Sequence, residues 1–353
     1  MSTPSSLFFE LWATPGSAPR RRRQPWVRDE SLCLKIRFYE SVVLLRTDFL
    51  QLYVALVAWS PPPIVTRESE KKYLCHASPK KPRPLPRLAD PSSVDLTVVV
   101  PAYNETERLP IMLASTIEHL TSPALKHKYK FEVLIVDDGS SDNTSAASLK
   151  LAAKYPKCDI RIVTLEKNLG KGGAVRHGML FGGGERLLMV DADGASRFTD
   201  LELLWEAMDE IAPDNAAGVV VGSRAHLVET EAVVKRSLLR NILMYGLHTI
   251  LRIVGVGHIR DTQCGFKLFS RAAAQQIFPA QHLPTWMFDV ELLLLAKQLR
   301  IPVAEVPIDW HEVAGSKLNV VTAPLQMLRD LLIVRANHLL GRWKAVPSKP
   351  KSN

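Results

Sequence analysis

Residues 186–195 read RLLMVDADGA, and this stretch decides how the chain folds and what it binds. The apolar run 186–190 predicts a buried strand, and Asp191 and Asp193 follow at its carboxyl end. Two carboxylates separated by a single residue can face one hard cation there, and oxygen ligands suit Mg²⁺ or Mn²⁺. A D-x-D pair also arises by chance, so its value as evidence for a metal site depends on the turns around it. We expect Asp191 and Asp193 to bind a divalent metal ion together.

Four further apolar runs, rich in Val, Ile and Leu, alternate with helical patterns. They are LTVVV (96–100), FEVLIV (131–136), IRIVTL (160–165) and GVVVG (218–222). This alternation predicts an α/β fold, with a Rossmann-like, mostly parallel sheet flanked by helices. Ligands of such sheets bind beyond the carboxyl ends of the strands. We therefore expect the turns after the first three runs to share one edge with the Asp191 turn.

The turn after residue 100 reads PAYNE (101–105). Pro101 is expected to end the strand, because proline fixes φ and removes a backbone N–H. Tyr103 offers a flat ring with a polar tip, which suits contact with a ligand at the sheet edge.

The turn after residue 136 begins with two adjacent carboxylates, Asp137 and Asp138. Two charges at the end of a buried strand are costly unless they meet donors such as ribose hydroxyls, a base N–H or helix N–H groups. The alternative is structural, with Ser141 or Asp142 capping the helix that follows. Both can hold, since Asp137 and Asp138 precede the cap.

The third turn, NLGKGGA (168–174), is glycine-rich and opens a helix. Gly170 and Gly172 let backbone amides approach an anion, and Lys171 and Arg176 add positive charge. The turn matches neither a Walker loop nor the G-x-G-x-x-G dinucleotide fingerprint. Tight packing against a neighbouring segment explains such glycines equally well.

Composition and charge exclude several classes of protein. The 353 residues are 46% hydrophobic and 23% charged, which is typical of a globular protein and excludes a disordered or fibrous chain. The four cysteines have no C-x-x-C spacing and are too few for a disulfide scaffold. Residues 1–90 hold 15 of the 45 basic and 8 of the 36 acidic residues, so +7 of the net charge of +9 lies there. The nearly neutral body argues against a nucleic-acid partner.

The chain is expected to divide at this change of composition. Residues 1–90 form a basic segment with 11 of the 24 prolines, and within it 41–60 resembles a short membrane anchor. The clean apolar part of that stretch, Phe49 to Trp59, is shorter than the ~20 residues of a membrane-spanning helix, so an interfacial helix is an alternative. The catalytic domain is expected over 91–343, followed by a tail over 344–353.

Two sets of motifs carry a resemblance to a known family. VVVPAYNE, VDDGSSDNT, NLGKGGAVRHG and VDADGA, in this order, resemble inverting family 2 glycosyltransferases, which have the GT-A fold. GSRAH (222–226), RDTQCGFKLF (260–269), WMFDVELL (286–293) and GSKL (315–318) are similar to the dolichyl-phosphate β-glucosyltransferase subgroup. GKGGA, DTQCGFKLF and FDVELL are the more specific motifs, and the resemblance covers roughly residues 66 to 343.

The resemblance implies an inverting transfer of glucose from UDP-glucose to dolichyl phosphate in the membrane. Dolichyl β-D-glucosyl phosphate and UDP would form at the cytosolic face of the endoplasmic reticulum, for assembly of the N-glycan precursor. It also implies roles for residues at matching positions. Those expected to bind the nucleotide sugar are Pro101, Tyr103, Glu105, Asp137, Asp138, Gly170, Lys171, Gly172 and Asp191. Asp191 and Asp193 match the metal-binding pair, and Arg224 lies in a motif suited to phosphate contact.

Asp289 is the candidate catalytic carboxylate, with Glu291 in reserve. A phosphate monoester has a second pKa of ~6, so at neutral pH it is already anionic and hardly needs a general base. Asp289 is therefore expected to orient the acceptor or the sugar, although an ordinary helix start also explains it. Trp286 suits stacking on the sugar face or burial in the core.

Two stretches, 238–259 and 325–343, mix apolar faces with Arg, His and Trp, as interfacial helices do. Surface helices that pack on the sheet are the alternative. Two other functions also stay open, namely a transferase for another sugar, such as mannose, and a non-catalytic adaptor that binds nucleotide sugars on membranes. The sequence predicts no oligomeric state.

Overall fold

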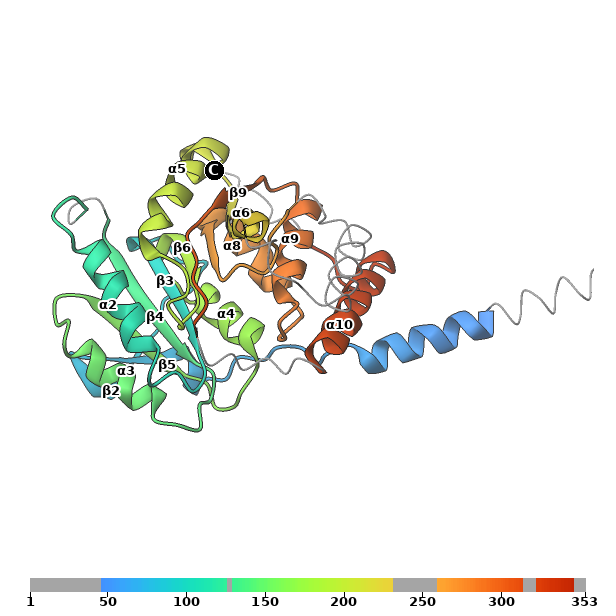
Figure 1. Cartoon of the computed structure of the whole chain (residues 1–353). Coiled ribbons are helices and arrows are strands. Elements are labelled where there is room, and N and C mark those ends of the chain that lie inside the picture. Colours follow the sequence, from blue (N-terminus) through green and yellow to red (C-terminus); the bar gives the residue numbers. More distant parts are fainter. Residues whose placement is uncertain (1–45, 126–128, 231–258, 314–321, 346–353) are drawn as a thin grey trace, which may run out of the picture. The chain divides into compact units, whose positions relative to one another are not determined.

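The computed structural model describes residues 46–125, 129–230, 259–313 and 322–345, without the side chains of 228–230 (Figure 1). The chain divides into two compact units, Met1–Ala55 and Leu56–Asn353. In the first unit the described residues, 46–55, are helical, and Phe49, Leu50 and Leu52 expose apolar side chains. No helix within the described ranges is both long enough and apolar enough to cross a membrane. The predicted interfacial stretch 238–259 lies outside those ranges except for Ile259.

A nine-stranded sheet forms the framework of the second unit, in the order β2-β1-β5-β4-β3-β6-β8-β7-β9. The pairs β5-β4, β4-β3, β3-β6 and β7-β9 are parallel, and only β1 and β8 run against the others. The strands are β1 Lys72–Cys75, β2 Ser78–Pro84, β3 Val94–Ala102, β4 Phe131–Asp137, β5 Asp159–Thr164, β6 Gly184–Val190, β7 Val219–Ser223, β8 Phe266–Ser270 and β9 Val303–Pro307. The predicted α/β fold with a mostly parallel sheet is confirmed.

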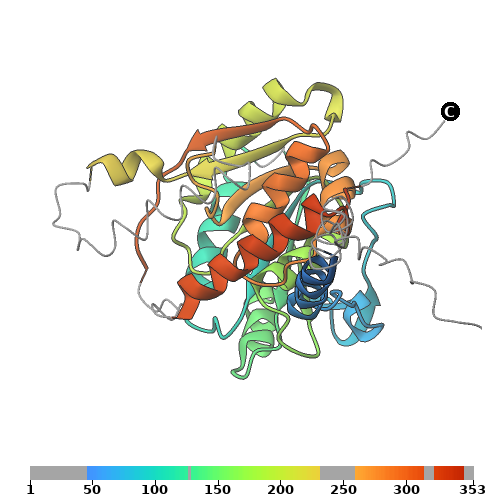
Figure 2. The same cartoon turned by 90° about the vertical axis from the view of Figure 1, so that its right-hand side faces the viewer.

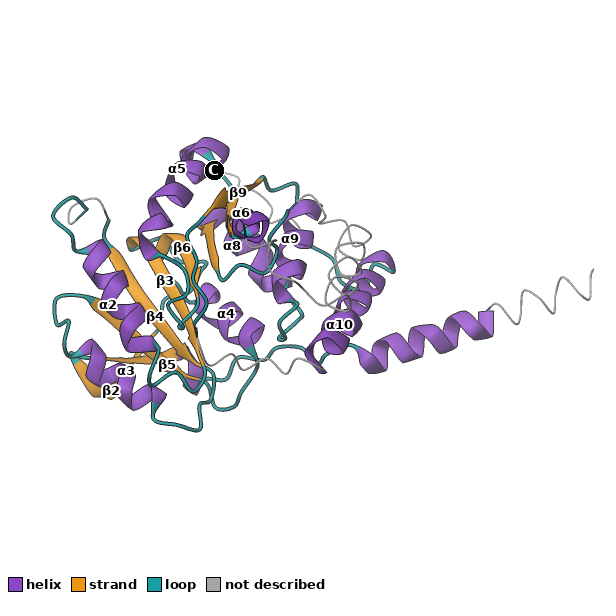
Figure 3. Cartoon of the chain, in the orientation of Figure 1, coloured by secondary structure: helices purple, strands orange, loops and turns teal. Residues whose placement is uncertain are grey.

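Helices cover both faces of this sheet (Figure 3). On β4, Val133 and Ile135 belong to the large core cluster, whereas Leu134 and Val136 pack in a second cluster with Ala174 of α4. Since alternate residues of a strand face opposite ways, both faces of β4 are buried. The helices are α2 Leu109–Leu120, α3 Thr144–Ala152, α4 Lys171–Leu180, α5 Leu201–Ile211, α6 Ala225–Thr230, α8 Arg271–Ile277, α9 Phe288–Gln298 and α10 Thr322–Leu339.

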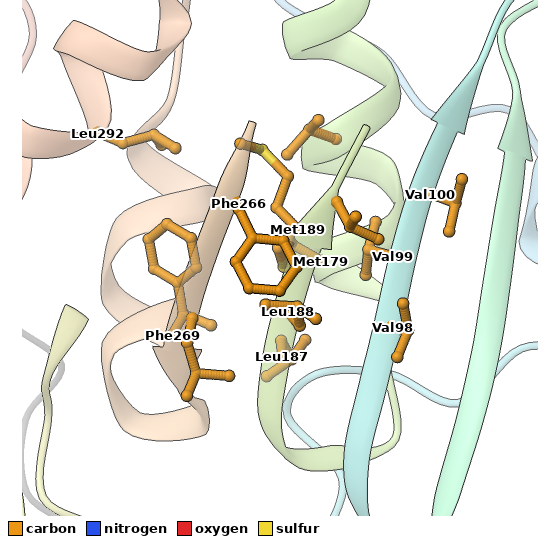
Figure 4. Close-up of a cluster of buried hydrophobic side chains, with 14 of the residues drawn as sticks. Val98, Val99, Val100, Met179, Leu187, Leu188, Met189, Phe266, Phe269 and Leu292 are labelled. Carbon is orange, nitrogen blue, oxygen red and sulfur yellow. The ribbon is translucent and has the colours of Figure 1, made fainter. Parts of the chain in front are cut away.

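The core is continuous across the middle of the sheet. Figure 4 shows Val98 of β3, Leu188 of β6 and Phe266 of β8 within one cluster of buried side chains. All three are fully buried, and burying an aliphatic or aromatic side chain contributes roughly 1.5–3 kcal/mol. This core fixes the ends of β3 and β6, which carry two of the predicted functional turns.

The five predicted strands are present, and the sequence missed four others, β1, β2, β8 and β9. β2 reads SPKKPRP and pairs on one side only, at the edge of the sheet, where proline and lysine are tolerated. Residues 72–84 were expected in the N-terminal segment 1–90, but they belong to the sheet. The boundary predicted at residue 90 therefore falls inside the compact unit that begins at Leu56.

Pro101 does not end its strand as expected. β3 continues to Ala102, and Pro101 is paired in register with Val136 of β4. Asp138 then donates its backbone N–H to the carbonyl of Ala102 at 2.8 Å, which extends the pairing beyond the strand ends.

Arg271 ties the segment before β3 to the body. Its buried guanidinium donates to the carbonyls of Gly182, Gly184, Arg87 and Asp90 at 2.7–3.2 Å. Arg87 and Asp90 lie 184 and 181 positions from Arg271 along the chain, and Gly182 and Gly184 lie 89 and 87 positions from it.

We expect Arg271→Met to lower the free energy of unfolding by about 3 kcal/mol, because four backbone carbonyls, two of them buried, lose a charged donor. Urea unfolding of the variant, with Arg83→Gln on the exposed edge of β2 as the control, measures this. A decrease in the free energy of unfolding of less than about 0.5 kcal/mol in Arg271→Met would show that Arg271 does not tie this segment to the body.

Candidate active site

The carboxyl ends of β3, β4, β5 and β6 meet at one edge of the sheet, because these strands are parallel and adjacent. In register, Ala102 of β3 is next to Asp137 of β4, and Asp137 is next to Thr164 of β5. The four predicted turns therefore lie side by side, as the sequence indicated.

Asp191 forms an ion pair with Lys171, whose Nζ lies 2.7 Å from Oδ1 and 2.8 Å from Oδ2. Burial opposes the charge on Lys171, but the carboxylates of Asp191 and Asp289 keep its pKa above the ordinary value. The carboxylate of Asp191 also lies directly over Gly265, where a Cβ atom would come within 2.0 Å of Oδ2. Gly265 is thus required for Asp191 to hold this position.

Asp193 is half-buried, and its Oδ1 accepts the backbone N–H of Ala195 at 3.0 Å. Burial and the nearby charge of Asp191 raise the pKa of Asp193. Lys171 and Arg108 act in the opposite direction on the same group. Two crowded carboxylates of this kind form a donor set that a hard divalent cation fits, because it neutralises both.

Glu105 is buried and binds the guanidinium of Arg108 through both carboxylate oxygens. The bond to Glu105 raises the pKa of Arg108, and burial opposes this effect. The nearby charges of Asp193 and Asp191 raise the pKa further. The sequence predicted Glu105 but missed Arg108, which follows it by three positions. Arg108 brings positive charge to the two aspartates.

Asp289 is buried at the start of α9 and accepts a hydrogen bond from Lys267 Nζ at 2.6 Å. Burial raises the pKa of Asp289, against the attraction of Lys267 and Lys171. Lys267 is itself fully buried on β8 and also donates to the carbonyl of Cys264 at 2.5 Å. Asp289, Lys171 and Asp191 thus form one electrostatic group, to which Lys267 adds the second positive charge.

Arg224 follows β7 and makes a bidentate ion pair with Asp261, at 2.7 Å from Nε and 2.9 Å from Nη2. Its guanidinium also lies over the ring of Trp310, 5.3 Å from the centroid. Burial lowers the pKa of Arg224 in isolation, and the bond to Asp261 more than reverses that effect. The sequence missed Asp261, although it lies in the quoted motif RDTQCGFKLF.

Asp138 joins two of the turns. Its carboxylate accepts the backbone N–H groups of Leu169 at 2.7 Å and Gly170 at 2.9 Å. Burial raises the pKa of Asp138 to about 7, against the effect of these two bonds. Asp137 accepts the N–H of Ser140 at 2.9 Å and the hydroxyl of Ser145.

The expected helix cap is placed differently. α3 begins at Thr144, and its N-cap residue is Asn143, whose side chain makes no capping bond. Asp142 accepts the backbone N–H of Thr144 at 2.9 Å instead. Neither Ser141 nor Asp142 is therefore the N-cap.

The glycine-rich turn packs tightly against the segment before α9. Gly170 has φ +88°, and a Cβ there would lie 2.6 Å from the carbonyl oxygen of Pro284. A Cβ on Gly172 would lie 2.7 Å from the carbonyl oxygen of Leu283 and from Cβ of Phe288. Close packing thus accounts for both glycines, while Lys171 between them points to Asp191.

The remaining candidates fall into two groups. Tyr103 is exposed beyond β3, and Trp286 is partly exposed, with Lys171 Nζ 5.5 Å from its ring centroid. Glu291, in contrast, is fully buried and accepts the backbone N–H groups of His282 and Leu283. The structure therefore gives the reserve carboxylate Glu291 a role in holding the loop before α9.

Comparison with known proteins defines the class. The family model of glycosyl transferase family 2 matches residues 97–278. A solved structure of glucosyl-3-phosphoglycerate synthase from Mycobacterium tuberculosis superimposes with a TM-score of 0.50 at 17% identity, over 69% of this chain and 81% of that one. The chain belongs to glycosyl transferase family 2 and is a glycosyltransferase, and the predicted GT-A fold is confirmed.

Curated relatives define the branch of the family. The dolichyl-phosphate beta-glucosyltransferase of Dictyostelium discoideum is 47% identical over 71% of this chain and 77% of its own length. The enzymes of that name from Homo sapiens and Saccharomyces cerevisiae are 43% and 44% identical, over 82% and 84% of this chain and 90% and 92% of their own lengths. Within family 2, the chain belongs to the dolichyl-phosphate beta-glucosyltransferases.

We expect Gly265→Ala to reduce kcat/KM at least about a hundredfold, because the new Cβ displaces the carboxylate of Asp191. Steady-state kinetics measures the loss, and thermal unfolding checks the fold. The control is Gly341→Ala, where the added Cβ would meet only the side chain of Lys344, at 3.2 Å, and this variant should keep its activity. Full activity of Gly265→Ala would contradict the requirement for glycine.

Asp138 predicts a pH dependence of stability. Its pKa is about 7 in the folded chain against a reference of 3.8, so the folded state binds the proton more tightly and loses stability as pH rises through about 7. We expect the free energy of unfolding to fall more between pH about 4 and 8 in the natural chain than in Asp138→Asn. Identical pH profiles of urea unfolding in the two proteins would show that Asp138 does not titrate in this range.

Proposed function

We propose that this chain transfers glucose from UDP-glucose to dolichyl phosphate with inversion. The products are dolichyl β-D-glucosyl phosphate and UDP, and the reaction supplies a glucose donor for N-glycan precursor assembly. The observation that carries the proposal is the placement of Asp191 and Asp193 at the carboxyl edge of the sheet, beside Lys171, in a chain of this family.

Asp191 and Asp193 are the residues that would hold a divalent cation, Mg²⁺ or Mn²⁺. Such an ion, when bound, neutralises the negative charge that develops on a UDP leaving group. Lys171 and Arg108 add positive charge from the protein at the same place, and both feel the charges of the two aspartates. Preorganised charges of this kind stabilise a developing diphosphate without reorganisation.

The turns after β3 and β4 would bind the nucleotide. Tyr103 is exposed at this edge, and Pro101 and Glu105 lie on either side of it in the chain. Asp137 and Asp138 are buried and already bonded within the protein. We propose that these two carboxylates shape the uridine site through their bonds within the protein. Gly170 and Gly172 fix the turn whose backbone Asp138 binds.

Asp289 is assigned to orienting the acceptor or the sugar. The acceptor phosphate has a second pKa of ~6 and is anionic at neutral pH, so no proton has to be removed before attack. Lys267 balances the charge of Asp289, which keeps the carboxylate fixed at the start of α9. Arg224 would contact a phosphate, with Asp261 holding its guanidinium in place.

The lipid acceptor requires contact with a membrane, and α10 suits that contact. Leu325, Leu328 and Leu332 are exposed along it, at 68%, 38% and 59%. Figure 2 shows α10, in red, running across the outside of the helices in orange. We propose that this face meets the endoplasmic reticulum membrane, with the active site towards the cytosol.

A two-donor assay tests the function. Purified full-length protein is incubated with a short-chain dolichyl phosphate and either UDP-glucose or GDP-mannose, with and without Mn²⁺. We expect labelled lipid with UDP-glucose only, and a fall of about 10²–10³ in Asp193→Ala, since a transition-state charge loses its stabilisation. The control Glu118→Ala removes an exposed carboxylate from α2 and should change nothing.

Labelled lipid with GDP-mannose alone would replace the proposed donor. Equal transfer by the natural chain and Asp193→Ala would remove the metal-binding pair from the reaction. Binding of UDP-glucose without any turnover would favour a non-catalytic adaptor.

A further inference from the structure

A cavity of about 460 Å³ lies among residues to which the proposed reaction gives no role. One wall is the segment Ser60–Ile64, and another is the loop from Pro279 to His282. Arg176 of α4 and Arg342, which follows α10, contribute the two guanidinium groups. No carboxylate lines the cavity among the described residues.

Among the residues that the structure describes, Arg176 forms no ion pair with a carboxylate at this site. It is half-buried, and its Nε donates to the carbonyl of Phe278 at 3.0 Å. Within the described residues, no Asp or Glu lies at ion-pair distance from Arg176. Burial lowers the pKa of Arg176, with a partial offset from the more distant Glu291. A half-buried guanidinium in this position favours an anionic ligand, which it binds in fork geometry.

Arg342 and His282 are held in place around the same space. Arg342 Nη1 donates to Asn337 Oδ1 at 2.5 Å and to Ser60 Oγ at 3.3 Å. The ring of His282 stacks on Trp343, with the centroids 4.2 Å apart and the planes 4° from parallel. The cavity is therefore built by fixed side chains from both ends of the compact unit.

Apolar side chains flank these basic residues along the chain. Val57 and Trp59 precede Ser60, and Leu339 and Leu340 precede Arg342; all four are exposed, Trp59 at 69%. Exposed tryptophan and leucine beside arginine are typical of the interface between headgroups and acyl chains. The combination distinguishes a membrane lipid from a free anion, which needs no apolar rim.

We propose that this cavity binds the phosphate of an anionic membrane phospholipid, through Arg176 and Arg342, while the flanking apolar side chains enter the lipid layer. The site is separate from the carboxylates at the sheet edge. It shares the loop before α9 with them, because Gln281 in its wall donates from Nε2 to the carbonyl of Gly172 at 2.9 Å. A bound headgroup thus also stabilises the loop that packs on the glycine-rich turn.

Vesicle flotation with the full-length protein tests the proposal and needs no turnover, so its failure leaves the proposed reaction standing. The vesicles are phosphatidylcholine alone, or phosphatidylcholine with about one-fifth phosphatidylserine. We expect Arg176→Gln to weaken binding to the anionic vesicles about tenfold, the effect of losing a charged hydrogen bond, with no change on neutral vesicles. Arg83→Gln, on the exposed edge of β2, removes the same charge elsewhere and should bind normally.

Three further comparisons decide between the proposal and its alternatives. An equal loss in Arg176→Gln and Arg83→Gln would overturn the proposal, because binding would then depend on net charge alone. Displacement of the protein from anionic vesicles by millimolar inorganic phosphate, at unchanged ionic strength, would assign the cavity to free phosphate instead. Thermal unfolding checks that Arg176→Gln is folded; if it is not, Arg342→Gln takes its place, with the same expected loss.

Discussion

The ion pair between Lys171 and Asp191 is the interaction on which the site depends. A carboxylate at the end of a buried strand costs free energy unless a positive charge lies beside it. Here Lys171 Nζ lies 2.7 Å from the carboxylate of Asp191. The same requirement recurs at Asp289, which pairs with Lys267, and at Glu105, which pairs with Arg108. Charge balance within the protein thus holds the acidic groups of the candidate site in fixed positions.

The parallel strands provide the second constraint, because they deliver their turns to one edge in a set order. The loop before α9 packs against that edge. Its backbone comes so close to the glycine-rich turn that only glycine fits there. A Cβ atom on Gly170 or Gly172 would collide with the carbonyl oxygen of Pro284 or Leu283, and one on Gly265 would collide with the carboxylate of Asp191. Close packing over Gly265 and the ion pair with Lys171 together fix the position of the Asp191 carboxylate.

Much of the fold could be predicted because its strands are continuous runs of apolar residues, buried on both faces. The sequence did not reveal β8, since Lys267 interrupts its apolar pattern and the carboxylate that balances its buried charge, Asp289, lies 22 positions later. It did not reveal β2 either, because KKPRP is compatible with a strand only at a sheet edge. The deciding contact of β8 is distant in sequence, whereas β2 depends on its place at the edge, beside the neighbouring strand β1.

The same distinction holds for the site. The D-x-D pair and the turns after β3, β4 and β5 could be located from motifs, since their position follows from strand order. Of the partners of the charged groups, the motifs located Lys171 but missed Arg108, although Arg108 is only three positions from Glu105. Glu291 resembles Asp289 in sequence, yet its carboxylate binds the backbone of His282 and Leu283. Only the path of that loop separates the two roles.

The most direct test of the central claim is the anomalous scattering of manganese in crystals of this chain grown with Mn²⁺ and UDP. The account predicts one strong peak within coordination distance of carboxylate oxygens of both Asp191 and Asp193. A peak bound by other residues, or none at this edge while UDP is present, would contradict it.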